Sequence, residues 1–132
     1  MIARDNAIRL GATINFQLKD ALQLTKTDET FDVILSNPPY ICDNERTEMM
    51  QNVLNFEPTT ALFVPDNDPL LFYRAIAEYG SSALSHGGEL YFEINSRFAD
   101  KVSDMLNAFD YTEIEVREDQ FGKQRFVKAI HP

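Results

Sequence analysis

A short apolar run that leads straight into two prolines constrains the fold of this chain more than any other feature. Residues Phe31–Ser36 read FDVILS, and Pro38 and Pro39 follow after Asn37. An apolar run of this length is typical of a strand that is covered on both faces in a parallel sheet. Because proline fixes φ and disfavours the α region at the residue before it, no helix can begin at once. We therefore expect a buried strand whose carboxyl end continues as an extended segment.

Helix and strand signals alternate along the whole chain. Strands are predicted at 13–18, 31–36, 89–94, 112–117 and 125–130, and helices at 4–10, 47–54, 69–83 and 97–109. Gly11 would end the first helix, and Asp68 and Ser96 would cap the starts of the last two. A short connection through Gly122 joins the two closing strands, which predicts an antiparallel pair at a sheet edge. Together these elements predict a three-layer α/β fold of the Rossmann-like kind, with a mostly parallel sheet.

Composition narrows the classes of protein to which the chain can belong. Its 132 residues are 44% hydrophobic and 25% charged, which fits one globular domain with a core. No apolar run approaches the length of a membrane span, and residues 1–10 lack the pattern of a secretory signal. The single cysteine, Cys42, excludes an internal disulfide, and with only His86 and His131 beside it no metal-ligand cluster is expected. We therefore expect a cytoplasmic protein without a metal.

The charge balance disfavours direct binding of nucleic acid. The formal net charge is −9 at pH 7. A protein that binds nucleic acid needs clustered Lys and Arg, which displace counterions from the phosphates. Charge alone leaves a nucleic-acid substrate open, because another domain could supply the basic surface.

The residues that follow the apolar run can hold a planar nitrogen group. In open α/β sheets, ligands bind beyond the carboxyl ends of the strands, where Asn37 is expected. The carboxamide oxygen of Asn37 and the backbone carbonyl of Pro38 can each accept one N–H of a single NH2 group. Tyr40 offers a ring face against which a planar group can stack. A proline pair after a strand can be a simple loop stop, but the whole Asn-Pro-Pro-Tyr sequence favours a substrate pocket made by Asn37, Pro38, Pro39 and Tyr40.

The sequence around this pocket resembles a known enzyme family. The run VILSNPPYI, at 33–41, resembles motif IV of the class I amino-methyltransferases. The segments around it are similar to the HemK/PrmC family, which methylates the side-chain amide of a glutamine in bacterial peptide chain release factors. These segments are FEPTTALF at 56–63, DNDPLLFYRAI at 66–76, GGELYFEI at 87–94 and DQFGKQRFV at 119–127. Asn-Pro-Pro-Tyr alone would also admit enzymes that act on adenine or guanine amino groups, and the segment at 57–62 favours the glutamine family.

The resemblance implies a cofactor, S-adenosyl-L-methionine, and a role for each pocket residue. Asn37 and Pro38 would make the catalytic contacts to the substrate amide, with Pro39 and Tyr40 completing the substrate site. Asp20 matches the acidic position that accepts the adenine amino group of the cofactor, and Asn37 would also lie against the cofactor. A solvated turn aspartate is the alternative for Asp20. The implied partner is a release factor, with no direct contact to nucleic acid or membrane.

Three polar residues near the pocket have roles that the sequence leaves open. Glu57 is expected to brace its loop rather than react, because methyl transfer to an amide needs no strong base in its first step. Glu93 is either a satisfied polar group or a brace for the pocket. The family commonly has glycine two residues after that glutamate, whereas this chain has Asn95. This departure puts a close approach of the backbone there in doubt.

The start of the sequence lacks the glycine-rich turn with which complete members of this fold bind their cofactor. The glycines at 11, 80, 87, 88 and 122 form no such loop. We therefore expect residues 1–132 to be the C-terminal part of a methyltransferase domain, truncated at the N-terminus, which binds cofactor weakly and is inactive alone. The open sheet edge would then pair differently, form a homodimer, or leave residues 1–20 loose.

Three functions remain as hypotheses from the sequence. The first is methylation of a release factor glutamine that depends on S-adenosylmethionine. The second is a nucleic-acid amino-methyltransferase, which a basic domain upstream would favour. The third is a non-catalytic fragment or pseudoenzyme that only binds a partner.

Overall fold

The computed structural model describes residues 1–42 and 63–132. In chain order the elements are α1 (Ile2–Arg9), the 3-10 turn η1 (Ala21–Gln23), β1 (Phe31–Ser36), β2 (Ile41–Cys42), β3 (Phe63–Val64), α4 (Leu71–Ala83), β4 (Leu84–Glu93), the 3-10 turn η3 (Ser96–Phe98), α5 (Ala99–Ala108), β5 (Thr112–Glu118) and β6 (Gln124–Ile130). The helix predicted at 47–54 and the role predicted for Glu57 lie outside the described residues.

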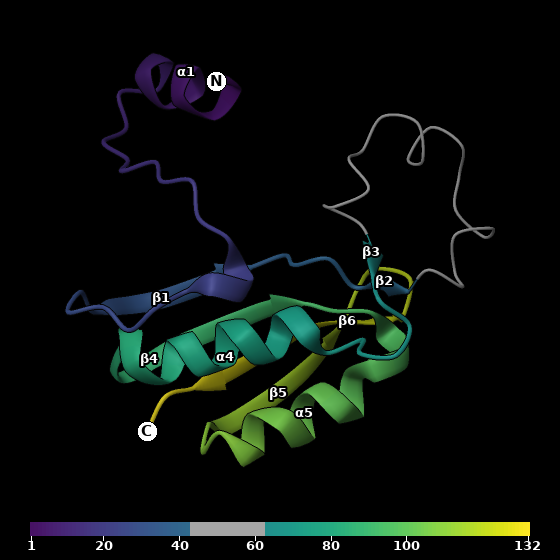
Figure 1. Ribbon diagram of the computed structural model, residues 1–132. Coiled ribbons are helices and arrows are strands. Elements are labelled where there is room, and N and C mark those ends of the chain that lie inside the picture. Colours follow the sequence, from purple (N-terminus) through teal and green to yellow (C-terminus); the bar gives the residue numbers. More distant parts are fainter. Residues whose placement is uncertain (43–62) are drawn as a thin grey trace.

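The main sheet has the strand order β1-β4-β6-β5 (Figure 1). β1 and β4 run parallel, with Ser36 opposite Phe92 at their carboxyl ends. β6 is antiparallel both to β4 and to β5. The antiparallel closing pair was predicted, with β5 at the edge and Gly122, at φ 79°, between the two strands. The sheet of the described residues is therefore mixed, which corrects the prediction of a mostly parallel sheet.

Helices α4 and α5 cover the same face of this sheet (Figure 1). Their apolar positions recur at helical spacing, so each helix buries one stripe of side chains against the strands. The resulting core takes alternate residues from β4 and β6, because successive side chains of a strand point to opposite faces. Its members include Tyr73, Ile76, Ala77, Leu90, Phe92, Val102, Leu106, Val127 and Ala129.

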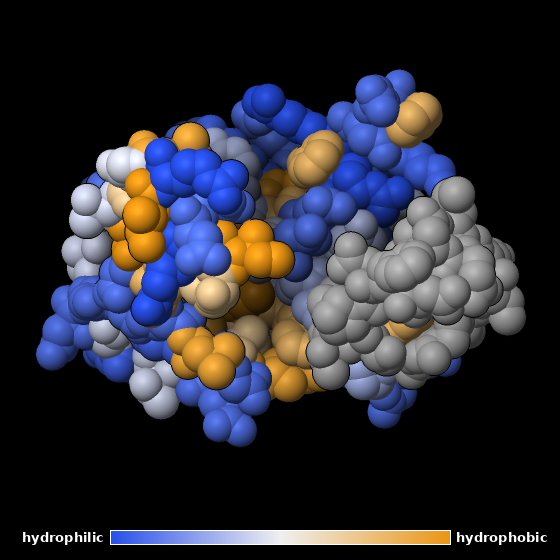
Figure 2. All heavy atoms as spheres, turned by 90° about the horizontal axis from the view of Figure 1, so that it is seen from above, coloured by the Kyte–Doolittle hydropathy of each residue, from blue (hydrophilic) through white to orange (hydrophobic). Residues whose placement is uncertain are grey.

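The opposite face of β1 is open in the described part of the chain. Leu35 is 74% exposed and Val33 is 46% exposed, whereas Ile34 between them packs against the core. The prediction that this strand is covered on both faces is therefore wrong for residues 1–42 and 63–132, where both long helices lie on one side. In the space-filling view, hydrophobic side chains gather around a hollow on the face shown (Figure 2).

The strand predicted at 13–18 does not form. Residues 12–20 have no regular structure, although α1 before them ends as predicted, with Gly11 at φ 66°. A strand needs a neighbour that completes its ladder of hydrogen bonds, and no described strand pairs with these residues. Helix α1 consequently stands apart from the sheet at the end of an extended connection (Figure 1).

Neither predicted helix cap forms. Asp68 does not cap α4, because its two carboxylate oxygens accept hydrogen bonds from the guanidinium of Arg74, each at 3.0 Å. The helix therefore begins later, at Leu71. Ser96 caps neither of the next two elements: Asn95 caps the short turn η3, and α5 follows Phe98 without a side-chain cap.

Strand β4 begins before the glycine pair at which the sequence predicts a turn. Gly87 lies at φ 77°, so the strand bends there without ending. A Cβ on Gly88 would lie 2.9 Å from the carbonyl oxygen of Ser85 and 3.2 Å from that of Asp32. Only glycine fits this close approach of β4 to β1, whose register shifts between Phe31 and Val33.

Candidate active site

The predicted pocket lies where β1 and β4 both end. Residues 37–40, here called the proline segment, continue from Ser36 at the carboxyl end of β1. Asn37 is exposed, Pro38 is buried, and Pro39 and Tyr40 are half-buried. No hydrogen bond within the described residues involves the Asn37 carboxamide. Its oxygen is therefore available to a ligand.

A hollow of about 660 Å³ opens beside Asn37 on the uncovered face of the sheet. All four strands of the main sheet contribute residues to its wall. On each strand, alternate side chains point to this face. The lining residues are Leu35, Ser36, Asn37, Tyr91, Phe92, Glu93, Arg117, Glu118 and Phe126. The wall combines the apolar and aromatic side chains of Leu35, Tyr91, Phe92 and Phe126 with polar groups, among them the Asn37 amide and the charged Glu93, Arg117 and Glu118.

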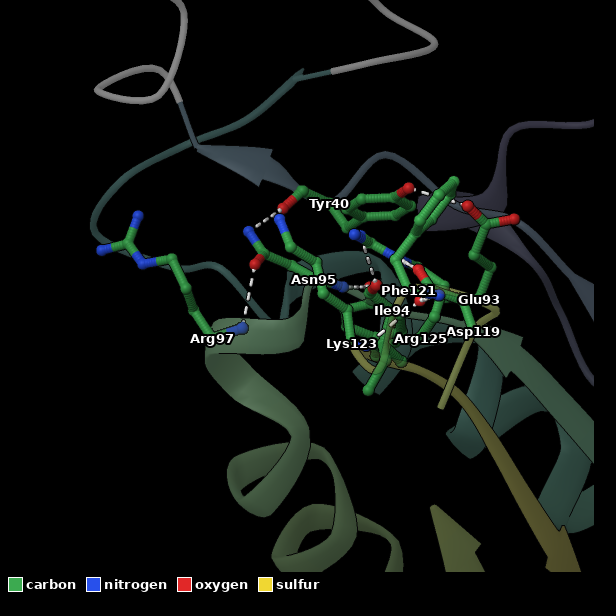
Figure 3. Close-up of polar contacts among 10 residues, drawn as sticks. Tyr40, Glu93, Ile94, Asn95, Arg97, Asp119, Phe121, Lys123 and Arg125 are labelled. Carbon is green, nitrogen blue, oxygen red and sulfur yellow. Dashed lines mark hydrogen bonds and ion pairs between the residues drawn. The ribbon is translucent and has the colours of Figure 1, made fainter. Parts of the chain in front are cut away.

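Tyr40 is fixed through its hydroxyl group. The phenol donates a hydrogen bond of 2.7 Å to Oε1 of Glu93, the last residue of β4 (Figure 3). Burial, followed by this hydrogen bond and the charge of Glu93, raises the pKa of Tyr40 to about 12. The phenol therefore remains a neutral donor at physiological pH, and Glu93 acts as the brace that the sequence left open.

Tyr40 is also fixed through its backbone. Nδ2 of Asn95 donates a 3.0 Å hydrogen bond to the carbonyl oxygen of Tyr40. Oδ1 of the same side chain accepts a 3.0 Å hydrogen bond from the backbone N–H of Arg97. Asn95 is 4% exposed. Its φ of −73° is ordinary for any residue, so no glycine is needed at this position.

A third contact reaches Tyr40 from the closing hairpin. The guanidinium of Arg125 lies 5.8 Å from the centroid of the Tyr40 ring, in cation–π geometry. Its Nη1 donates a 3.2 Å hydrogen bond to the carbonyl of Ile94, and its Nε lies 3.7 Å from Oδ2 of Asp119. We call Glu93, Asn95 and Arg125 the Tyr40 clamp (Figure 3).

The hairpin turn itself holds Asp119 in place. Its Oδ1 accepts backbone N–H bonds from Phe121 at 2.8 Å and Lys123 at 3.1 Å. These bonds, together with Arg125, lower the pKa of the Asp119 carboxyl below its usual value. Asp119 thus remains ionised and can orient the guanidinium over Tyr40.

Asp20, the predicted cofactor residue, lies away from this clamp. It caps η1, with Oδ1 accepting a 2.9 Å hydrogen bond from the backbone N–H of Leu22. It lines a separate hollow of about 350 Å³ together with Lys19, Gln23 and Tyr79 among others. Of the predicted site residues, Asn37 lines the hollow beside the sheet, whereas Pro38, Pro39 and Tyr40 follow it in the chain and are not part of that lining. Asp20 lies in another place.

Two clamp residues were missed as site residues by sequence reasoning. Asn95 gave a signal, because it departs from the family glycine, but its hydrogen-bond partners are not encoded in local sequence. Arg125 lies 85 positions after Tyr40 in the sequence, and only the pairing of β6 with β4 brings the two residues together. Within the described ranges, no cluster of metal-binding side chains occurs and no helix is long and apolar enough to cross a membrane.

Curated relatives are similar to this chain over nearly its whole length. No family model matches the sequence. A release factor glutamine methyltransferase of Bacteroides thetaiotaomicron is 46% identical over 129 residues, which cover 97% of this chain and 46% of the relative. This chain is homologous to the HemK/PrmC family. A member from Flavobacterium psychrophilum is 40% identical over 127 residues, covering 96% of this chain and 45% of that relative.

The chain spans about half the length of these HemK/PrmC relatives and matches their C-terminal part. Solved structures share its fold at low identity. TrmN from Thermus thermophilus superposes with a TM-score of 0.56 at 18% identity, covering 98% of this chain and 32% of TrmN. A protein from Bordetella parapertussis gives a TM-score of 0.57 at 19% identity, covering 99% and 50%. The fold is that of the class I methyltransferases.

Proposed function

We propose that this chain provides the substrate site of an S-adenosylmethionine-dependent methyltransferase that modifies a glutamine side-chain amide in peptide chain release factors. One observation carries the proposal: the Asn37 carboxamide is exposed at the end of β1 and makes no hydrogen bond within the described residues. The names of the curated relatives support glutamine and release factors as the substrate. In this proposal residues 1–132 form part of a single methyltransferase domain that acts in the cytoplasm.

Asn37 and Pro38 act on the reacting nitrogen by holding its hydrogens. The side-chain oxygen of Asn37 and the backbone oxygen of Pro38 each accept one N–H of the substrate amide. Two acceptors orient the NH2 plane and increase the electron density on nitrogen. In the proposed transfer the bond from this nitrogen to the methyl carbon would form as the bond from that carbon to sulfur breaks, S-adenosylhomocysteine would leave, and one of the two amide protons would pass to water. The proline pair keeps both oxygens in place, because it removes backbone freedom from the segment. Tyr40, fixed by its clamp, packs against the planar amide.

S-adenosylmethionine, when bound, supplies an electrophilic methyl group on sulfonium. Asp20 fits one contact to it, since the carboxylate is exposed and a second oxygen remains beside the one that caps η1. That oxygen would accept the adenine amino group, and Asn37 would lie near the methyl donor. These two residues are few for a nucleoside cofactor. We therefore expect the 132-residue chain to bind S-adenosylmethionine weakly or not at all in calorimetric titration. Micromolar affinity would overturn this expectation.

The substrate proposal is tested by joining residues 1–132 to the N-terminal portion of the Bacteroides thetaiotaomicron relative that they do not match. This chimera is expected to transfer a labelled methyl group from S-adenosylmethionine to release factor, whereas the 132-residue chain alone is not. Asn37→Ala should lower kcat by about 100-fold, because the reacting nitrogen loses an oriented acceptor. Asn107→Ala, on the exposed part of α5, is the control and should leave the rate unchanged.

Two results would contradict the proposal. If the chimera methylates an oligonucleotide and leaves release factor unmodified, the site belongs to a nucleic-acid amino-methyltransferase. If it binds the cofactor and modifies neither substrate, these residues form a non-catalytic site.

A further inference from the structure

The carboxamide of Asn95 connects the proline segment to the turn η3, through its nitrogen on one side and its oxygen on the other. Its Nδ2 donates to the carbonyl oxygen of Tyr40 at 3.0 Å, and its Oδ1 accepts from the N–H of Arg97 at 3.0 Å. Figure 3 shows the side chain lying between these partners. Among residues 1–42 and 63–132, Asn95 is the one polar residue that is buried, with 4% of its surface exposed. A buried amide is costly to place unless its polar atoms are paired, so this arrangement specifies one orientation.

The backbone of Asn95 is itself anchored in the core. Its N–H donates a 3.3 Å hydrogen bond to the hydroxyl oxygen of Tyr73, and that hydroxyl donates at 3.3 Å to the carbonyl of Glu93. Tyr73 is fully buried and packs edge to face on Phe92, with ring centroids 5.1 Å apart. The backbone of Asn95 is therefore held in place, and a movement of Tyr40 would break its hydrogen bond to the Asn95 side chain.

The proline segment is consequently fixed at both ends. Ser36 is held in the sheet opposite Phe92, and Tyr40 is held by Asn95 at its carbonyl. The residues between these two points include two prolines, which leave few backbone rotations. We propose that Asn95 is a positioning residue, which keeps Asn37 and the Pro38 carbonyl in the geometry that holds the substrate amide. This inference rests on the proposed function of Asn37 and Pro38.

A purely structural role for Asn95 makes a different prediction. As the cap of η3, Asn95 needs only an oxygen that accepts the Arg97 N–H. Asn95→Ser keeps such an oxygen but is too short to reach the Tyr40 carbonyl. Asn95→Asp also keeps the cap, while its carboxylate cannot donate to a carbonyl. Asn95→Ser should resemble the wild type if Asn95 is only a cap, and it should release Tyr40 if Asn95 is a positioning residue. Asn95→Asp should release Tyr40 as well, but it also buries a carboxylate, so Asn95→Ser decides between the two roles.

The first test measures motion in the 132-residue chain by 15N relaxation. We expect order parameters typical of a rigid backbone, about 0.85, at Asn37 and Tyr40 of the wild type. In Asn95→Ser and Asn95→Asp these values should fall below about 0.6, while α5 residues remain rigid. The control is Ile76→Val, which removes one core methyl group and should leave both order parameters unchanged. Unchanged values in both Asn95 variants would overturn the proposal.

The second test measures methyl transfer to release factor by the chimera. Asn95→Ser is expected to lower kcat by about tenfold with KM for release factor nearly unchanged, because the reacting groups are misplaced while the rest of the protein contact remains. Ile76→Val should lower the melting temperature without changing kcat. A wild-type rate in Asn95→Ser would refute the positioning role. If wild-type chimera leaves release factor unmodified, the proposed function fails, and the relaxation result still decides whether Asn95 fixes the proline segment.

Discussion

Tyr40 has an unusual electrostatic setting for a tyrosine in a proposed substrate site. Its hydroxyl faces the Glu93 carboxylate at 2.7 Å, and its ring faces the Arg125 guanidinium. Burial is the largest cause of its raised pKa, followed by the hydrogen bond to Glu93 and the charge of that residue. Arg125 acts in the opposite direction and only partly offsets these effects. The neutral phenol is therefore the form that the folded state stabilises.

This pKa predicts how stability changes at alkaline pH. The folded-state pKa of about 12 lies above the ordinary tyrosine pKa of 10.0. The contribution of Tyr40 is thus fully present below pH 10 and is lost as the pH rises through about 12. Thermal unfolding followed from pH 9 to pH 12 should show a smaller loss of stability in Tyr40→Phe than in the wild type. Tyr73 and Tyr111 also have raised pKa values, so part of the loss should remain.

Glu93→Gln separates the causes of the Tyr40 shift. Removing the carboxylate charge should lower the Tyr40 pKa in a 13C titration of the tyrosine ζ carbons. The pKa should nevertheless stay above 10.0, because burial is its largest cause and remains. A Tyr40 signal that titrates like an exposed tyrosine in the wild type would contradict the half-buried hydrogen bond to Glu93.

At the scale of residues, the substrate pocket stays a prediction from the sequence, and the contacts that fix Tyr40 were not predicted. Asn37 and Pro38 are recognised because their chemistry is carried by neighbouring positions in the chain. Asn95 and Arg125 reach Tyr40 only after β4 and β6 have paired, so no local pattern shows their partners. Asp68 illustrates the reverse error, because a strong local cap signal was overridden by its ion pair with Arg74.

At the scale of elements, Tyr111, the residue before β5, packs tightly against α4. Tyr111 is 2% exposed, and its hydroxyl donates a 2.7 Å hydrogen bond to the carbonyl of Ala77 in α4. One turn further along the helix, a Cβ added to Gly80 would lie 2.5 Å from that hydroxyl oxygen. Gly80 is thus kept by packing, although glycine is a poor residue for the interior of a helix.

Gly80→Ala is therefore expected to destabilise the chain in spite of its better helix propensity. The clash with Tyr111 should cost about 1–3 kcal/mol in the free energy of unfolding, as overpacked core sites do. The measurement is urea denaturation followed by circular dichroism. In a Tyr111→Phe background the hydroxyl is gone, so the same change should be neutral or stabilising by up to about 1 kcal/mol. An equal loss of stability in both backgrounds would refute the clash.

The elements that the sequence predicted best are those whose signal is local. The FDVILS run is β1 to the residue, and the closing strands lie within a residue of their predicted bounds. The 13–18 segment was wrong because a strand depends on a partner as well as on its own pattern. The early start of β4 also escaped prediction, since Gly87 and Gly88 look like a turn until their approach to β1 is known.

At the scale of the whole molecule, the described chain has one covered face and one open face. Its large exposed hydrophobic side chains include Phe31, Val33 and Leu35 on β1 and Phe126 on β6. β1 also forms an end of the sheet order, so one of its edges has unpaired backbone groups in the described residues. Exposed apolar strands at a sheet edge favour pairing with another chain.

We therefore expect the 132-residue chain to form a homodimer through the β1 edge. Sedimentation equilibrium should show a mass that rises with concentration in the range of about 10–100 μM, as for a modest interface. Leu35→Lys places a charge on this strand and should shift the protein to monomer, at little cost in folding because Leu35 is 74% exposed. Leu18→Lys is the matched control, since Leu18 is exposed outside the sheet and should not change the mass. The prediction would be contradicted by a wild-type protein that is monomeric throughout this range and in which 15N relaxation shows residues 12–20 to be rigid. Such a result would mean that the open edge of β1 is stable in water without a partner strand.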